Sequence, residues 1–90
     1  MFNDFLSNSQ TLINEIKQSH SQGDKDEVKK LIHNLKGITA SFGASSLAVL
    51  CEKIENHCVN YDVMEIDSLI KQLEIEYIKT QKEILRQITD

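Results

Sequence analysis

The segment His33-Asn34-Leu35-Lys36-Gly37 holds the residues of this chain with the clearest chemical potential. An imidazole that faces water titrates near pH ~6.5, so much of it is neutral and nucleophilic at cellular pH. Such a nitrogen can attack a phosphoryl group and carry it as a phosphoramidate. On a helix, Lys36 lies one turn after His33, where its ammonium can neutralise the phosphate oxygens. Gly37 leaves bare backbone beside both side chains, which gives another protein close access to the histidine.

The periodicity of the surrounding residues predicts that His33 faces solvent. Apolar residues recur with helical spacing on the side of the segment away from His33: Val28, Leu31, Ile32, Leu35, Ile38 and Phe42. The histidine therefore lies on the outer face of a helix that buries its other side. A glycine inside such a helix costs about 1 kcal/mol relative to alanine. We therefore attribute Gly37 to something other than local stability.

Capping signals divide the chain into four predicted helices. The first runs from about residue 4 to residue 21 and ends at Gly23. Gly43 ends the second, and Ser45 or Ser46 is expected to cap the third. Two pairs have the spacing of a capping box and open the second and fourth helices: Asp24 with Glu27, and Asp62 with Glu65.

The other three predicted helices also carry one apolar stripe each. The stripe of the first helix holds Phe5, Leu6, Leu12, Ile13 and Ile16; that of the third holds Leu47, Leu50, Cys51, Ile54, Cys58 and Tyr61; and that of the fourth holds Ile66, Leu69, Ile70, Leu73, Tyr77, Ile84 and Ile88. The short connections force neighbouring helices to run antiparallel. We expect an all-α fold, an antiparallel up-down-up-down four-helix bundle, with residues 1–90 as a single domain.

The composition of the chain argues against several classes of function. The net charge of −4 argues against a nucleic-acid binder, for which a basic face is typical. No apolar run approaches the roughly 18 residues of a membrane span, and no signal-peptide pattern opens the chain. Cys51 and Cys58 would lie about 10 Å apart along one helix, too far for a disulfide. Reduced cysteines and a cytoplasmic location are therefore expected.

The segment from His33 to Gly37 is followed at fixed offsets by Phe42-Gly43-Ala44, Leu47 and Ile54-Glu55. This pattern, within residues 28–55, resembles the core signature of histidine-containing phosphotransfer (HPt) domains. Those domains are four-helix bundles that relay phosphoryl groups between the aspartates of response-regulator receiver domains in two-component phosphorelays. The resemblance implies that His33 is the phosphoacceptor and becomes a phosphohistidine. It also implies that Lys36 orients the phosphate and that Gly37 permits close approach.

The resemblance also places Glu55 on the third helix beside the histidine. There the carboxylate is a candidate hydrogen-bond partner for the second ring nitrogen of His33, and the alternative is a solvated carboxylate. Ile38 and Thr39 stand where the family usually has small residues, which affects the fit of a partner rather than phosphorylation.

The expected partners are receiver domains, including one within a hybrid sensor histidine kinase. Their docking surface is expected to combine small or polar residues: Gly37, Ala40, Ser41, Ala44, Ala48 and Glu52. Residues 24–42 hold four lysines against three acidic residues, and a basic patch with Lys29 and Lys30 suits an acidic receiver pocket. No carboxylate cluster surrounds His33 in sequence, so the partner supplies the Mg²⁺ for transfer, and no cofactor or metal site is expected in this chain.

No kinase module accompanies the signature, so the chain is predicted to be a phosphocarrier rather than an enzyme. It receives its phosphoryl group from a phosphorylated partner. Its 90 residues fit a small free-standing protein or the cytoplasmic C-terminal module of a membrane-bound hybrid kinase. A monomer is expected, because a bundle of this length closes its own core.

Two other functions stay open. The first is an adaptor or inhibitor that binds a receiver or another signalling partner without being phosphorylated. The second is an oligomerisation module, because Ile75 and Ile78 fall off the main stripe of the last helix and indicate a small apolar patch.

The remaining histidines and cysteines are interpreted as structural. Cys51, His57 and Cys58 lack the spacing of a metal finger, and neighbouring residues on a helix point about 100° apart. His20 lies near a helix end, where the dipole favours a cation, and is expected on the surface.

Overall fold

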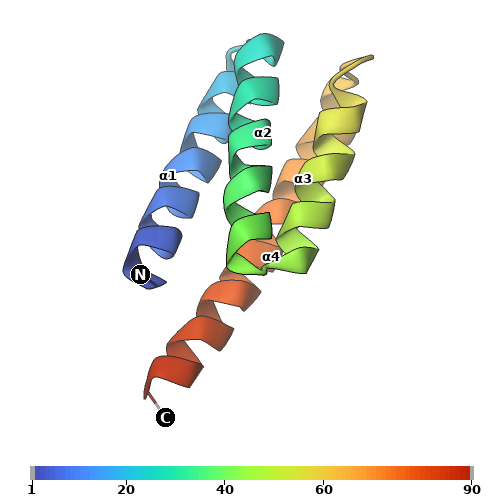
Figure 1. Ribbon diagram of the computed structural model, residues 1–90. Helices are drawn as coiled ribbons and strands as arrows, with labels where there is room; N and C mark the ends of the chain where they lie inside the picture. The colour runs from blue at the N-terminus through green and yellow to red at the C-terminus, as the bar shows by residue number, and fades with distance from the viewer. Residues whose placement is uncertain (1, 90) are drawn as a thin grey trace.

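Four antiparallel helices form the part of the protein that the structure describes. The computed structural model describes residues 2–89, with side chains described for residues 4–86. The helices are α1 (Phe2–Ser21), α2 (Lys25–Phe42), α3 (Ser45–His57) and α4 (Val63–Thr89). Figure 1 shows α1 and α3 running one way and α2 and α4 the other way. The predicted all-α four-helix bundle is confirmed.

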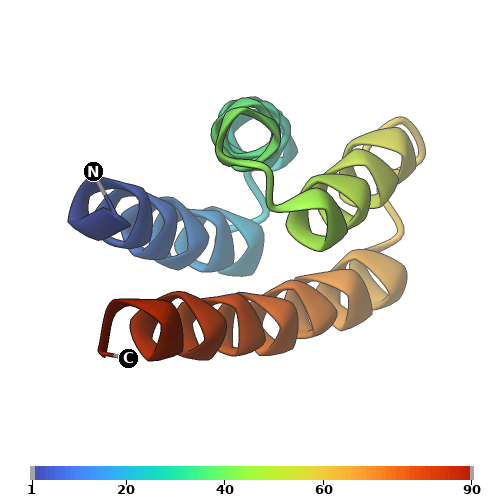
Figure 2. The same ribbon diagram turned by 60° about the horizontal axis from the view of Figure 1, so that its bottom comes forward.

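The helices surround the core in a square arrangement. Viewed toward the helix ends, α2 and α4 occupy opposite corners, and α1 and α3 lie between them (Figure 2). Each of α2 and α4 packs against both α1 and α3, whereas the described backbones of α2 and α4 do not approach closely. At 27 residues, α4 is twice as long as the 13-residue α3, and its C-terminal turns extend past the bundle (Figure 1).

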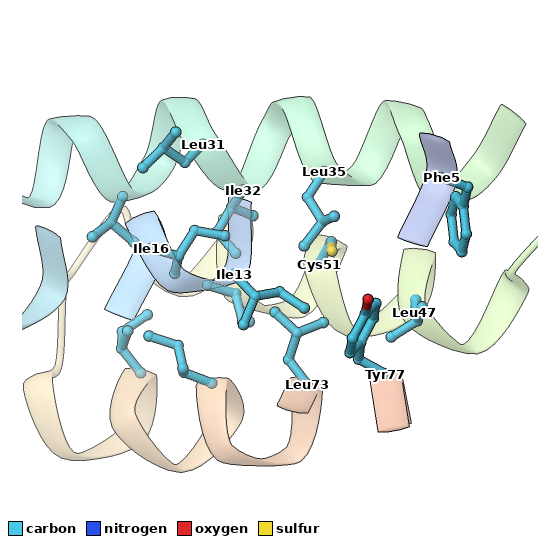
Figure 3. Packing of buried hydrophobic residues seen from close by; sticks show 14 of the residues in the cluster. Phe5, Ile13, Ile16, Leu31, Ile32, Leu35, Leu47, Cys51, Leu73 and Tyr77 are labelled. Carbon is cyan, nitrogen blue, oxygen red and sulfur yellow. The ribbon is translucent and has the colours of Figure 1, made fainter. Parts of the chain in front are cut away.

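One apolar core fills the space between the helices, and all four contribute to it (Figure 3). Its fully buried members include Ile13, Ile16, Ile32, Leu35, Leu47, Ile54, Ile66 and Leu73. Burying each such side chain stabilises the fold by about 1.5–3 kcal/mol. The predicted stripes are therefore confirmed, with Leu6, Leu12, Leu50 and Leu69 at the core margin, except that Cys58 and Tyr61 follow the end of α3 and pack against the core from there. The side chain of Ile88 lies outside the described residues.

Two aspartates cap helices as predicted, but among the described residues neither Glu27 nor Glu65 returns the second hydrogen bond of a capping box. The Asp24 carboxylate accepts a hydrogen bond from the backbone N–H of Glu27 at 3.2 Å. The Asp62 carboxylate accepts from the backbone N–H groups of Met64 (3.1 Å) and Glu65 (3.2 Å). The backbone N–H of Asp24 donates to the Ser19 carbonyl, so Asp24 both closes α1 and opens α2.

The predicted cap of α3 is wrong. Ala44, not Ser45 or Ser46, is the N-cap residue, and no side chain caps this helix. Gly43 adopts φ +90°, and its N–H and that of Ala44 bond to the carbonyls of Ala40 and Thr39 at the end of α2. This Schellman-type ending leaves a connection of two residues, so Ala44 must also start α3.

The expectation of a surface His20 is also wrong. Its side chain is only 9% exposed, and its Nδ1 lies 2.7 Å from the Tyr61 hydroxyl. Tyr61 was expected on the third helix, but α3 ends at His57 and Tyr61 lies in the following turn. From there it covers the end of α1, a contact that helical spacing within one segment does not reveal.

The backbone at Gly43 gives the first prediction. Gly43→Ala should lower the free energy of unfolding by about 1–2 kcal/mol, because a Cβ is strained at φ +90°. Gly37→Ala is the matched control: a Cβ there meets nothing within 4 Å, and alanine favours a helix by about 1 kcal/mol. Urea unfolding followed by circular dichroism measures both variants. A Gly43→Ala variant as stable as the parent would contradict the left-handed turn.

Candidate functional site

The outer face of α2 presents His33 to solvent. Its neighbours Ile32 and Leu35 are fully buried, whereas the imidazole is 68% exposed. The packed inner face therefore fixes the rotation of the helix, and this rotation directs the histidine outward, as the spacing predicts.

Glu55 reaches the histidine from α3. Its Oε2 lies 2.8 Å from His33 Nδ1. A carboxylate can only accept, so Nδ1 carries the proton and donates it to this hydrogen bond. In the neutral ring the lone pair then belongs to Nε2, which has no hydrogen-bond partner among the described residues. Glu55 thus selects the tautomer whose exposed nitrogen is nucleophilic.

The same carboxylate also holds Lys36. Lys36 Nζ donates to Glu55 Oε1 at 2.9 Å, and its side chain is 34% exposed. One oxygen of Glu55 therefore orients the imidazole and the other orients the ammonium. The structure brings together the three residues that the sequence singled out for chemistry.

The three residues influence one another electrostatically. Hydrogen bonds from Lys36, and next from His33, lower the pKa of the Glu55 carboxyl below its usual range. The hydrogen bond to Glu55 and the attraction of its charge raise the pKa of the Lys36 ammonium. Glu55 therefore stays ionised as an acceptor, and Lys36 stays cationic next to the position where a phosphate would lie.

The residues predicted for docking lie on α2, on α3 and in the connection between them. Gly37, Ala40 and Ser41 are exposed on α2, as are Lys29 and Lys30.

On the neighbouring helix, Ala48 is half-buried and Glu52 is exposed, and Ala44 in the connection is half-buried. A Cβ added at Gly37 would meet nothing within 4 Å. Packing inside the chain therefore does not explain why position 37 is a glycine. Access to His33 by another molecule is the explanation that fits.

A shallow groove beside His33 was not predicted. It runs between α1 and α2 and is lined by Phe5, His33, Asn34, Gly37, Ile38, Ser41 and Phe42. The rings of Phe5 and Phe42 stack with their centroids 4.0 Å apart and form one end of it. Phe42 was visible in the sequence pattern, but its pairing with Phe5, far away in the chain, was not. Ile38, which departs from the usual small residue, lines the same groove.

Neither cysteine belongs to the hydrogen-bonded group of His33, Lys36 and Glu55, and neither does His57 on α3, which bonds to the Lys53 carbonyl. Both cysteines are free thiols, and burial, followed by the charge of Glu55, raises the pKa of Cys51 to about 12. Cys51 is therefore protonated at neutral pH. Among the described side chains, those of residues 4–86, no three from His, Cys, Asp or Glu are grouped so that they could hold a metal ion.

Nearly the whole chain matches one protein-family model. The model of the Hpt domain matches residues 1–88. The chain belongs to the Hpt domain family. Hpt domains are phosphocarrier modules of histidine phosphorelays and interact with receiver domains. Neither the curated proteins nor the solved structures gave a match. In the described part of this Hpt domain, no helix is both long and apolar enough to span a membrane.

The shared carboxylate gives a second prediction. Lys36→Met should raise the pKa of Glu55 more than His33→Ala does, because the Lys36 hydrogen bond is the larger cause of its lowering. Carbon-detected NMR titration of the Glu55 carboxyl measures both shifts. Equal shifts, or none, would contradict the bridged geometry.

The sign of the pH effect on stability follows from the same pKa. The folded-state pKa of Glu55 is lowered, so its contribution to stability is present above the unfolded value of about 4.3. That contribution is lost as the pH falls through the folded-state pKa. Below pH ~4, the free energy of unfolding measured with urea should therefore fall more for the parent than for Glu55→Gln, because glutamine cannot titrate at this position.

Proposed function

We propose that this Hpt domain carries a phosphoryl group on Nε2 of His33 and relays it between receiver-domain aspartates. The observation that carries the proposal is the exposed imidazole whose Nδ1 proton is held by Glu55 at 2.8 Å. That hydrogen bond leaves Nε2 as the nucleophile and points it away from the bundle. This arrangement supports a carrier, because a carrier needs a nucleophile and a protein that only binds a partner does not.

The transfer needs no proton from solvent. The Nε2 lone pair attacks the phosphorus of a receiver's aspartyl phosphate, the N–P bond forms, and the P–O bond to the aspartate breaks. The aspartate leaves as a carboxylate, and the ring takes on positive charge. Glu55, already ionised and bonded to Nδ1–H, stabilises that charge as it develops. Transfer to a second receiver is the reverse reaction.

Lys36 is proposed to orient the phosphoryl group. It lies one turn from His33, and Glu55 keeps its ammonium charged and restrained. A restrained cation loses less side-chain entropy when a phosphate arrives than a freely moving one does. The acidic pocket of the receiver would hold the Mg²⁺ for the reaction, and that ion would neutralise charge on the phosphoryl group.

The surface around the histidine supports a receiver as the partner. Lys29 and Lys30 add positive charge beside small exposed residues, and the adjacent groove offers an apolar floor. Opposite charge speeds encounter, and small residues allow close approach. We propose that the partners include the receiver of a hybrid sensor histidine kinase. We also propose that the domain works as a monomer in the cytoplasm, which the two free thiols support.

Replacing the nucleophile tests the relay. His33→Gln should abolish labelling from a radiolabelled phosphorylated receiver domain, whereas the parent should gain label that is acid-labile and alkali-stable, as a phosphoramidate is. His57→Gln is the matched control, because His57 is also a partly exposed histidine, on α3, and this variant should keep full labelling. A His33→Gln protein that still binds receivers beside a parent that takes no label would favour the adaptor or inhibitor function.

Enlarging Gly37 tests the approach of the partner. Gly37→Gln should slow transfer from a receiver by tenfold or more, an effect of about 1.4 kcal/mol on the barrier. Labelling by phosphoramidate, a small donor that needs no docking surface, should keep its rate. Gly37→Ala should fall between the parent and Gly37→Gln. If both donors slow equally, the glycine acts on His33 itself rather than on docking.

A further inference from the structure

A second stripe runs along α4 on the side away from the core. Its members follow one another at alternating steps of four and three residues, the spacing of a heptad seam. All of them are exposed: Met64, Ser68, Lys71, Ile75, Ile78, Lys82 and Leu85. We call this set the outer seam. The core stripe of α4, with Ile66, Ile70, Leu73, Tyr77 and Ile84, faces the opposite way. One helix therefore presents two surfaces on which another helix can pack.

The middle of the outer seam is apolar and open. Ile75 is 57% exposed, Ile78 is 48% exposed, and Met64 nearer the start of α4 is 83% exposed. Neither isoleucine is needed for helix formation, because β-branched residues are weaker helix formers than the lysines and glutamates around them. Spaced three apart, the two isoleucines are neighbours on the surface of α4. Ile75 also lines a groove toward α3, and Ile78 lines one toward α1.

Lysines flank this patch at both ends. Lys71 precedes Ile75 by four residues, and Lys82 follows Ile78 by four, so both lie in the seam itself. Their methylene stems extend the apolar surface while their ammonium groups seek anionic partners. Lys71 is already 3.2 Å from Asp67. That contact is an exposed pair within one helix, which contributes little and leaves the ammonium available to another carboxylate.

We propose that the outer seam docks an acidic amphipathic α-helix of another protein. The docked helix places apolar side chains on Ile75 and Ile78 and carboxylates opposite Lys71 and Lys82. The docked helix recognises the outer seam as helices in coiled coils recognise each other, through apolar contacts in the centre and ion pairs at the ends.

The same lysines argue against a second copy of this chain. A parallel pairing of α4 would place each seam lysine against its own counterpart. An antiparallel pairing centred on the isoleucines would place Lys71 against Lys82 of the second copy. Both pairings bring like charges together inside the contact, where they are destabilising.

The overall charge of α4 argues against a lipid surface. The helix carries five acidic residues against four basic ones. Helices that lie on anionic membranes have instead a strongly basic polar face. A lipid surface would need more basic residues than α4 has, whereas a docked helix needs only carboxylates opposite Lys71 and Lys82, which are both exposed.

The seam lies on the far side of the molecule from His33. Because α4 occupies the corner opposite α2 (Figure 2), a helix on its outer face does not cover the histidine. The proposed helix and a receiver can thus bind together. This inference therefore stands apart from the relay on His33 and can fail without it.

Designed peptides test the surface with the full chain. The probe is a labelled helical peptide of about three heptads with leucine at the two central seam positions and glutamate at the flanking seam positions. The matched peptide carries lysine in place of those glutamates. Fluorescence anisotropy should show the glutamate peptide binding at least tenfold more tightly at low salt. The Lys71→Glu, Lys82→Glu double variant should reverse this preference.

Single substitutions locate the contact. Ile75→Gln should weaken binding of the glutamate peptide about tenfold, as expected for losing one buried aliphatic side chain. Val59→Gln is the control, because Val59 is 77% exposed and lies in the turn before α4. Circular dichroism confirms that both variants fold, and labelling of His33 by phosphoramidate should be unchanged in both.

Four results would overturn the proposal: equal binding of the two peptides, no binding of either, concentration-dependent dimers that Ile75→Gln abolishes, or binding to phosphatidylserine vesicles instead of the peptide. Dimers would assign the seam to a second copy, and vesicle binding would assign it to a lipid surface. Each result can be read whether or not His33 accepts phosphate, because the labelling assay is separate.

Discussion

The site depends on one carboxylate that joins two helices. Glu55 holds His33 Nδ1 at 2.8 Å with one oxygen and Lys36 Nζ at 2.9 Å with the other. It therefore sets the tautomer of the nucleophile and the place of the cation in a single contact between α2 and α3. Beneath it, Leu35 and Cys51 are buried in the core and hold the two helices against each other. The geometry of His33, Lys36 and Glu55 at the surface therefore depends on the packing of α2 against α3.

This division of labour suits a carrier. The domain supplies an exposed nitrogen at His33, a fixed charge at Lys36 and room for a partner at Gly37. A rigid bundle serves this purpose because each of its helices buries one face completely and leaves the other for display. Little of the outer surface of α2 is then constrained by folding, and Gly37 and its small neighbours can be selected for access alone.

Much of this architecture was predictable from local patterns. Helical spacing is a local property, so the four helices, their core stripes and the outward direction of His33 followed from the order of residues. The position of Glu55 depended on a family resemblance, because no spacing rule places a residue of α3 beside one of α2. The Ala44 cap, the burial of His20 under Tyr61 and the stack of Phe5 on Phe42 were missed. Each of these arises from how separate segments meet, which single-segment patterns do not encode.

The two-residue connection between α2 and α3 has a mechanical consequence. Gly43 and Ala44 are held by backbone hydrogen bonds, so this short connection cannot change its length. The number of residues between His33 and Glu55 therefore fixes how the two side chains lie against each other. One residue inserted into α3 ahead of Glu55 would rotate its carboxylate by about 100° around the helix and remove it from the imidazole. The two-residue length of the connection, together with the left-handed turn at Gly43, therefore fixes where Glu55 meets His33.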